Sequence, residues 1–298
     1  MNGIINIYKE KGYTSFDVVA ILRRKLGIKK VGHTGTLDPE AEGVLPICIG
    51  KATKVADYIT DTKKVYRATM TLGVTTDTQD HTGKVLSQKN VTVSKDAIEK
   101  AIASFVGEYE QIPPMYSALK VNGKRLYTLA RQGKTIERKA RKVMIYDIVV
   151  HEVEGIHVDM SIACSKGTYI RTLCADIGDK LQCGAHMSKL VRTKSSLFSI
   201  EASHTLDEID TYIQEERLDE IMLPISQVFN YDKRIIDTRY DKLLYNGNKL
   251  SQACVMHNEQ ITENKRYSVY DEREKFIGIY QTVIIDGQML LKPIKIFL

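Results

Sequence analysis

A short loop near the amino terminus carries the residues best suited to chemistry. Residues 32–43 read GHTGTLDPEAEG, and an apolar run follows at 44–49. The three glycines permit backbone angles that are closed to other residues. Pro39 fixes its own φ angle and biases Asp38 away from helical geometry. The loop therefore places a carboxylate on a stiff turn directly before a buried strand. A carboxylate held in this way is positioned to take part in a reaction.

The same residues also fit a purely structural turn. An aspartate before a proline often accepts hydrogen bonds from nearby backbone N–H groups, and an isolated Asp-Pro pair favours that interpretation. His33 has the ring of a metal ligand, but no second histidine or cysteine in the sequence stands at ligand spacing from it. The sequence therefore predicts no metal site.

The composition describes a folded protein with a mild positive charge. The 298 residues include 43 Lys and Arg against 37 Asp and Glu, a formal net charge of +6 that permits a nucleic-acid partner without requiring one. We find no secretory signal and no apolar stretch as long as a membrane span. The five cysteines are odd in number and contain no Cys-x-x-Cys pair, which argues against disulfides and zinc. We expect a soluble, cytoplasmic protein.

The positive charge is concentrated between residues 120 and 142. Nine lysines and arginines in this segment are opposed by Glu137 alone. Phosphate groups are the natural partner of such a segment. A basic run can equally be a solvated surface that keeps a protein soluble, so the charge by itself leaves both interpretations open.

The elements that must position the loop mix strands and helices. An apolar strand at residues 4–7 precedes a helix that Thr14 or Ser15 can cap and Gly27 can end. Alternation from residue 65 predicts a half-buried strand. Residues 158–164 predict another, and an amphipathic helix follows directly after the Ser-Lys-Gly turn that ends it.

This mixture, without regular strand–helix alternation, favours an α+β fold with a mainly antiparallel mixed sheet and flanking helices. Beyond Pro224 the pattern changes to short strands bounded by turns, which indicates a small β-rich domain. We expect a first domain at residues 1–228 and a second at residues 229–298.

Residues 32–39, continuing through Gly43-Val44-Leu45-Pro46, resemble the catalytic loop of the bacterial TruB-type pseudouridine synthases. The resemblance runs from about the first strand to Phe198, and the carboxy-terminal piece resembles a small PUA-like RNA-binding domain. Further stretches resemble the remaining motifs of the family in order: Lys64-Val65-Tyr66-Arg67, Thr76-Asp77-Thr78 with Asp80 and Gly83, residues 113–120 (PPMYSALK) and residues 164–171 (CSKGTYIR).

The resemblance implies isomerisation of the uridine at position 55 in the T arm of tRNA, after the nucleotide is flipped out of its stack. The uracil is cut from ribose at nitrogen, turned and rejoined through carbon, with no metal or redox cofactor. Breaking a glycosidic bond develops positive charge on the sugar, which an adjacent carboxylate stabilises. Asp38 matches the catalytic aspartate of the family, and attack on the sugar and removal of a proton from it are both open roles.

The resemblance also implies roles for four other residues. Arg171 pairs with the catalytic aspartate and fixes its direction. Tyr66 stacks on the target base and is a candidate for the final proton abstraction, although an inward tyrosine on a strand is ordinarily a core residue. His33 helps to displace the target nucleotide by stacking in the RNA, and Leu190 forms a wall of the uracil pocket.

The segment at about residues 108–142 resembles the bacterial insertion that grips the T arm directly. By this resemblance we expect a monomer that needs no protein partner. Two rival interpretations are a guide-RNA-dependent synthase acting on ribosomal RNA and a tRNA-folding protein that binds RNA without catalysis. The residues expected to contact the substrate RNA, besides His33 and Leu190, are Lys120, Lys124, Arg125, Arg131, Arg141 and Arg192.

Overall fold

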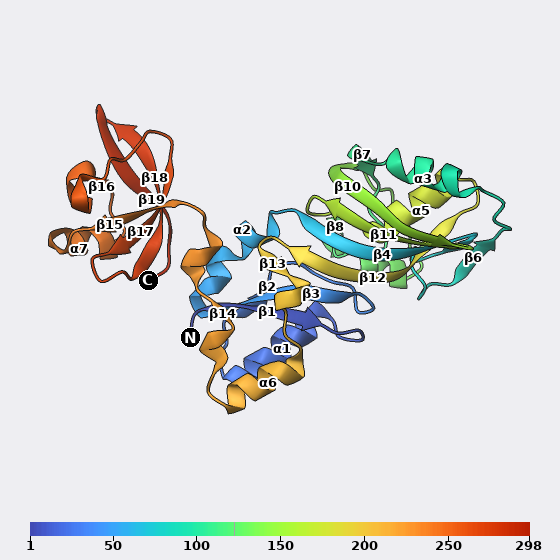
Figure 1. Cartoon of the computed structure of the whole chain (residues 1–298), viewed down its shortest axis with the longest axis horizontal. Helices are drawn as coiled ribbons and strands as arrows, with labels where there is room; N and C mark the ends of the chain where they lie inside the picture. The colour runs from blue at the N-terminus through green and yellow to red at the C-terminus, as the bar shows by residue number, and fades with distance from the viewer. Residues whose placement is uncertain (122) are drawn as a thin grey trace.

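The computed structural model describes residues 1–121 and 123–298, and the side chains of Lys120 and Asn258 are outside what it describes. A ten-stranded sheet forms its centre, in the order β14-β1-β3-β12-β4-β11-β10-β7, with β2 beside β3 and β13 beside β12 (Figure 1). The strands are β1 (Gly3–Lys9), β2 (Val31–His33), β3 (Glu42–Ile49), β4 (Lys64–Leu72), β7 (Gly107–Gln111), β10 (Arg141–Glu154), β11 (His157–Cys164), β12 (Ala185–Ser195), β13 (Phe198–Ser199) and β14 (Met222–Leu223).

Helices cover this sheet in two groups. Below the β1–β3 half lie α1 (Ser15–Leu26) and α6 (Leu206–Gln214), while α3 (Lys95–Ala103) and α5 (Ile170–Lys180) lie against the other half (Figure 1). The remaining helices are the short α2 (Ala56–Thr60), α4 (Leu126–Arg131) and α7 (Asp241–Tyr245). Among the described residues, no helix is both long and apolar enough to cross a membrane.

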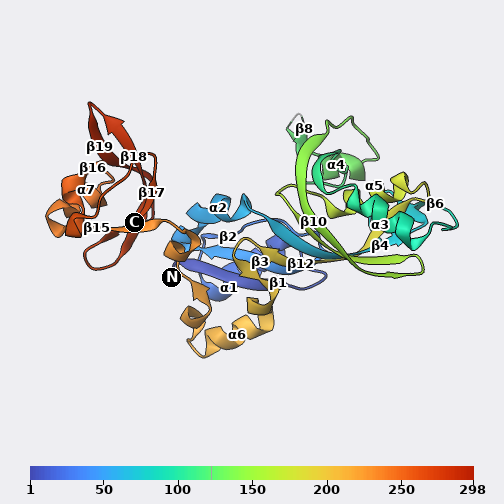
Figure 2. The same cartoon turned by 45° about the horizontal axis from the view of Figure 1, so that its top comes forward.

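Two small hairpins extend from the main sheet. One pairs β5 (Val74–Thr76) with β6 (Val85–Gln88), and the other pairs β8 (Lys120–Val121) with β9 (Lys124–Arg125). Figure 2 shows β8 and α4 at the same end of the molecule as α3 and α5. The basic segment of the sequence therefore lies at the end of the sheet that α5 covers.

The carboxy-terminal residues form a second sheet with a core of its own, in which Tyr267 and Tyr280 are fully buried. Its order is β15-β17-β18-β19-β16, with β15 and β17 parallel and the other pairs antiparallel. As predicted, short strands follow Pro224. They are β15 (Asp232–Ile236), β16 (Leu250–Ser251), β17 (Arg266–Asp271), β18 (Phe276–Ile285) and β19 (Gln288–Ile296).

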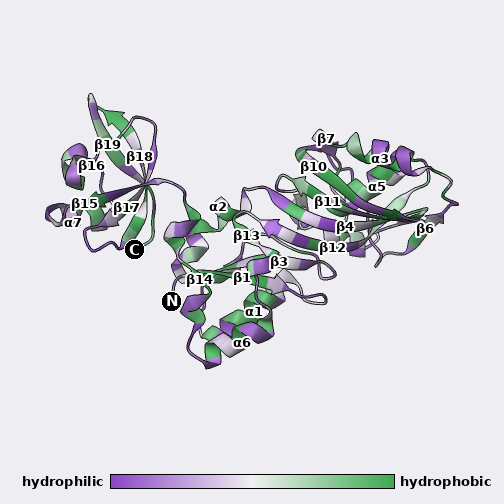
Figure 3. Cartoon of the chain, viewed as in Figure 1, coloured by the Kyte–Doolittle hydropathy of each residue, from purple (hydrophilic) through white to green (hydrophobic). Residues whose placement is uncertain are grey.

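An apolar cluster joins the two sheets. Phe229 follows the last strand of the main sheet, and its ring packs against Phe276 and Phe297 of the second. Lys54 adds a hydrogen bond from Nζ to the carbonyl of Ile296, at 2.9 Å. Figure 3 shows hydrophobic residues along the strands of both sheets and hydrophilic residues on the outer faces of the helices. The expected α+β fold with a mainly antiparallel sheet is confirmed.

Local signals explain the helix that precedes the candidate loop. The Thr14 hydroxyl accepts a hydrogen bond from the Asp17 amide, and the Asp17 carboxylate accepts one from the Thr14 amide, which together make a capping box. Gly27 ends α1 in the left-handed conformation, as expected. The side chain of Ser15 then bonds to the amide of Leu37, so the start of α1 holds the loop that carries Asp38.

One pair of neighbouring strands in the main sheet, next to that loop, is parallel. β3 and β12 run parallel, with Gly43 opposite Arg192, whereas the other ladders of this sheet are antiparallel. Gly43 has a φ of 101°, and a Cβ atom there would lie 2.3 Å from the carbonyl oxygen of Arg192. A glycine is therefore required where the candidate loop enters β3.

Candidate active site

Asp38, on the loop before β3, forms an ion pair with Arg171 of α5. Arg171 Nη1 lies 2.9 Å from Asp38 Oδ2, and the exposed fractions of the two side chains are 6% and 43%. The guanidinium is thus buried while the carboxylate stays open to solvent. An ion pair at this distance favours one direction of the carboxylate. The predicted pairing of these two residues is present in the structure.

Arg171 also connects two other parts of the chain. Its Nη1 lies 3.5 Å from Asp80 Oδ2, and its Nη2 donates to the carbonyl of Tyr116. The residue stands in the first turn of α5, where the positive end of the helix dipole disfavours a cation. The two carboxylates offset that placement, so one buried arginine joins the loops at residues 38 and 80 to the segment that contains Tyr116.

Asp80 is a site residue that the sequence analysis named within a family motif but gave no role. Its Oδ1 accepts hydrogen bonds from the hydroxyl of Thr78, at 2.7 Å, and from the amide of Thr82, at 3.0 Å. Burial raises the pKa of Asp80, but the hydrogen bonds from Thr82 and Thr78 and the charge of Arg171 outweigh burial and leave the pKa below its usual value. Asp80 is therefore an ionised support for Arg171.

Lys9 is a second residue that the sequence analysis missed. Its side chain is fully buried, and Nζ donates to the carbonyls of Glu10, Tyr13 and Pro39 at 2.7–3.1 Å. Burial lowers the pKa of Lys9 to about 8. The ammonium group thus ties the end of β1 to the residue that follows Asp38. Its place at the end of an apolar strand, before Gly12, was the signal available in the sequence.

A small hollow of about 20 Å³ lies beside Asp38 and Asp80. This volume is enough for about one water molecule, so a nucleobase does not fit there in this conformation. Leu190 lines the hollow and is 9% exposed, and its contact with a uracil stays a prediction. The other lining residues are Glu40, Ala41, His81, Met187, Ser188 and Lys189.

Tyr66 lies on β4 with its ring buried among core residues. Burial raises the pKa of its hydroxyl, and the charge of Asp38 raises it further, whereas Arg192 lowers it. Among the described residues, Tyr66 does not line the small hollow. Contact with a base therefore requires the site to open, and the proposed catalytic role of Tyr66 stays a prediction.

Arg192 differs from what the sequence led us to expect. We predicted a contact with the substrate RNA, but the side chain is 1% exposed. Its Nε donates to the carbonyl of Val44 at 2.7 Å, and its Nη2 donates to that of Gly35 at 3.1 Å. In this structure Arg192 holds the loop that carries Asp38, and its side chain is not available to a phosphate.

His33 lies at the end of β2, directly before the loop. Its ring is half-buried, and Nδ1 accepts a hydrogen bond from the amide of Gly35 at 3.3 Å. Burial lowers the pKa of His33, and the nearby charge of Arg192 lowers it too. A neutral, planar ring fixed on a rigid loop suits the stacking role that we expect for it.

The basic segment presents several of its cations to solvent. Lys124, Arg125, Arg131 and Arg141 are all exposed. Arg125 donates to the hydroxyl of Tyr127, and Arg131 lies 5.6 Å from the centre of the same ring. The side chain of Lys120 lies outside the described residues. The exposed cations are available to a polyanion.

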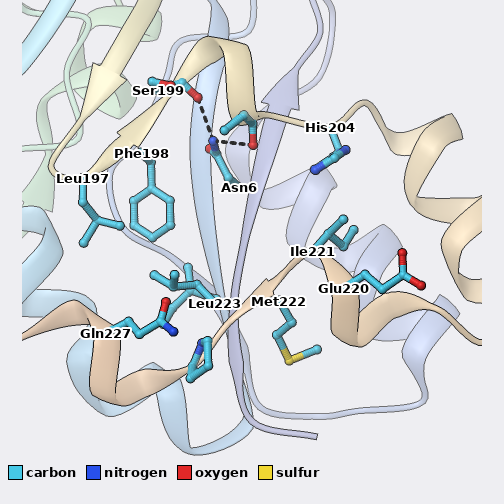
Figure 4. A pocket seen from close by; sticks show the side chains of 13 residues that line it. Asn6, Leu197, Phe198, Ser199, His204, Glu220, Ile221, Met222, Leu223 and Gln227 are labelled. Carbon is cyan, nitrogen blue, oxygen red and sulfur yellow. Dashed lines mark hydrogen bonds between the residues drawn. The ribbon is translucent and has the colours of Figure 1, made fainter.

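A hollow of about 500 Å³ lies elsewhere, along β1, β13 and β14 (Figure 4). Figure 4 shows the Asn6 side chain bonded to the carbonyls of Ser199 and Ala202 at one end of it. No site residue predicted from the sequence lines this hollow. Volume alone therefore does not locate the chemistry of this chain.

The amino-acid sequence matches one family of known proteins over most of its length. Residues 23–170 match the TruB family pseudouridylate synthase N-terminal domain, and residues 171–230 match the tRNA pseudouridylate synthase B C-terminal domain. The chain is 51% identical to the tRNA pseudouridine synthase B of Clostridium novyi, over 94% of this chain and 95% of that protein. It is 50% identical to the Alkaliphilus oremlandii protein of the same name, over 93% and 92%.

Two solved structures illustrate the fold. One is a chain of an H/ACA RNP bound to a substrate RNA containing 2′-deoxyuridine, with a TM-score of 0.73 and 25% identity over 99% of this chain and 85% of that one. Another is a chain of a Cbf5-Nop10-Gar1 complex, with a TM-score of 0.73 and 27% identity over the same shares.

Asp80→Asn tests the buried support of Arg171. We expect the substitution to lower the free energy of unfolding by about 2 kcal/mol at pH 7, because a neutral amide replaces a charged acceptor. Since the folded-state pKa of Asp80 lies below its unfolded value, wild type loses this contribution as the pH falls below about 4. Urea unfolding from pH 7 to pH 3 should show the difference between the two proteins shrinking.

The exposed Asp96 of α3 offers the control, because Asp96→Asn should leave stability within about 0.5 kcal/mol of wild type. A difference between wild type and Asp80→Asn that stays constant down to pH 3 would contradict an ionised Asp80 in the folded state.

Proposed function

Because the chain belongs to the TruB family of pseudouridylate synthases, we propose that it isomerises uridine to pseudouridine at position 55 in the T arm of tRNA. The observation that carries this proposal is the ion pair between Asp38 and Arg171 beside a hollow lined by Leu190. The high identity to tRNA pseudouridine synthases of other bacteria supports the choice of tRNA as substrate.

In the proposed reaction, the flipped nucleotide enters beside Asp38 once the hollow opens. The carboxylate faces the anomeric carbon and stabilises the positive charge that develops there as the C–N bond breaks. Arg171 keeps the carboxylate aimed during this step. Leu190 lets the detached uracil turn against an apolar wall, C5 bonds to the sugar, and Tyr66 is the candidate that removes the C5 proton.

Two basic surfaces support a long contact with RNA. The first is the exposed cluster of Lys124, Arg125, Arg131 and Arg141. The second is a hollow of about 430 Å³, which we call the basic hollow, next to the start of β2. Its lining residues are Arg23, Lys29, Lys30, Val31, Gly50, Lys51, Thr53, Lys54 and Leu298.

The position of the basic hollow suits a double-stranded substrate. Lys30 immediately precedes β2, and the loop that carries Asp38 follows the other end of the same strand. A helical stem bound with its loop at Asp38 would thus extend towards five cations, and counterion release at its phosphates favours binding. We infer that the T arm occupies the site while an adjoining stem lies on the basic hollow.

The proposed domain organisation follows the sequence expectation. Residues 1–228 form the catalytic domain, and residues 229–298 form a PUA-like domain that contacts the same RNA. The second sheet supports this division because it has its own core, and the second of the two family matches ends at residue 230. The enzyme acts in the cytoplasm as a monomer, with no obligatory protein partner and no cofactor.

A guide-RNA-dependent activity is the second candidate. The structural likeness to H/ACA proteins favours it, but identity to those chains is 25–27%, compared with 51% to a tRNA enzyme. A tRNA-folding role is compatible with catalysis, because the same basic surfaces would serve both.

The direct test is tritium release from a tRNA transcript labelled at uridine C5, with purified protein, a chelator and no guide RNA. We expect release from position 55 by wild type and a loss of at least about 1,000-fold in Asp38→Asn, because the amide cannot stabilise the cationic sugar. Asp96→Asn, which replaces an exposed aspartate of α3, should retain wild-type activity. No release by wild type that binds tRNA tightly would sink the proposal.

Neutralising the basic hollow tests the RNA path. For the Lys51→Gln, Lys54→Gln double variant, the slope of log affinity against log salt should fall by about 1–2 for whole tRNA, because fewer counterions are released. A short T-arm hairpin should bind this variant as it binds wild type. Lys95→Gln, which breaks a surface pair with Glu99 on α3, is the matched control. Equal losses for tRNA and hairpin would contradict a stem bound in the hollow.

A further inference from the structure

Arg192 is a buried cation of the main sheet. Among the residues that the structure describes, no carboxylate forms an ion pair with it. A buried charge is costly unless its hydrogen-bonding groups are satisfied. Lys64, which is buried nearby, adds to the cost, since burial and the charge of Arg192 together lower its pKa to about 8. We therefore expect a function of Arg192 that offsets the free-energy cost of burying its charge.

The first part of that role is a tie across the catalytic loop. Gly35 lies three residues before Asp38, and Val44 lies six residues after it. The guanidinium of Arg192 binds the carbonyls of both, with distances of 3.1 Å to Gly35 and 2.7 Å to Val44. One planar group with fixed donor directions therefore sets the separation of the two ends of the loop.

The second part is the pairing of Arg192 with Tyr66 across two strands. Arg192 on β12 and Tyr66 on β4 are directly opposite in an antiparallel ladder, so their Cβ atoms are about 5 Å apart on the same face of the sheet. Burial raises the pKa of Tyr66, whereas the charge of Arg192 acts in the opposite direction. The residue that binds Gly35 and Val44 is thus also the cross-strand neighbour of Tyr66.

We propose that Arg192 is a positioning residue of the reaction, which holds the Tyr66 hydroxyl at a fixed place relative to the loop that carries Asp38. This inference rests on the function proposed above, in which Asp38 acts at the sugar and Tyr66 accepts the C5 proton. Because one residue binds the loop and neighbours the tyrosine, it sets where the hydroxyl stands when the detached base has turned. Arg192 itself touches no reacting atom.

A purely structural arginine would behave differently on substitution. Its loss would lower stability and slow every step that depends on the loop, with no preference for the last one. A residue that acts through Tyr66 affects removal of the C5 proton most, and its effect disappears when the tyrosine hydroxyl is absent.

The test compares Arg192→Gln and Arg192→Lys, each with and without Tyr66→Phe, in single turnovers on tRNA with hydrogen or deuterium at uridine C5. We expect Arg192→Gln to slow turnover by about 100-fold, to raise the C5 deuterium isotope effect above that of wild type, and to add little to Tyr66→Phe. Arg192→Lys, which keeps the charge but loses the two-carbonyl tie, should fall between wild type and Arg192→Gln. Unchanged isotope effects with fully additive losses would overturn the proposal.

A second measurement needs no turnover. With 13C-labelled tyrosine, and Tyr66→Phe to assign the signal, the titration of Tyr66 should begin at a higher pH in Arg192→Gln than in wild type. If wild type itself releases no tritium, the proposed function fails, while this titration still decides whether Arg192 acts on Tyr66. An unchanged titration would overturn the inference, and Arg192→Lys serves for both measurements where Arg192→Gln does not fold.

Discussion

The buried guanidinium of Arg171 is the constraint on which the candidate site depends. It binds Asp38, Asp80 and the carbonyl of Tyr116 at once, from a helix end that disfavours its charge. Removing any one partner leaves a buried cation less well compensated, which is costly. The loop at residue 38, the loop at residue 80 and the segment at residue 116 are therefore held in one arrangement by a single residue.

The main sheet supplies the rigid frame for this arrangement. β4, β12 and β3 are neighbours, so Tyr66, Arg192 and Gly43 lie in a row across three strands. Leu190 stands two residues before Arg192 and faces the hollow beside Asp38. Strands fix side chains more precisely than loops do, which explains how a flexible-looking glycine-rich loop can hold a reactive carboxylate in place.

The hydrogen bond from Arg171 to the carbonyl of Tyr116 links the small hollow beside Asp38 to the basic segment. Tyr116 belongs to the segment at residues 108–142, whose exposed cations favour RNA. A movement of that segment on binding would change a partner of Arg171 and open the space beside Asp38 together. One hydrogen bond thus connects this segment to the arginine that binds Asp38.

The sequence predicted the parts of the site that reside in local patterns. The glycines and Pro39 indicated a specified loop, the alternation around Tyr66 indicated its strand, and the capping residues of α1 were correct. The roles of Asp80 and Lys9 were missed because each depends on partners brought close by the fold. Arg192 was assigned to RNA because a charge in a sequence is ordinarily exposed, and nothing local reveals that its strand lies at the centre of a sheet.

The most direct test of this account is Arg171→Lys, which keeps the positive charge but lacks the planar fork that reaches three partners. Single-turnover rates and tRNA dissociation constants should be measured for this variant and wild type under the same salt conditions. We predict a rate lower by about 100-fold, because a small misplacement of the carboxylate is enough to cause such a loss, with tRNA affinity unchanged. A wild-type rate, or a loss explained entirely by weaker tRNA binding, would contradict the central role of Arg171.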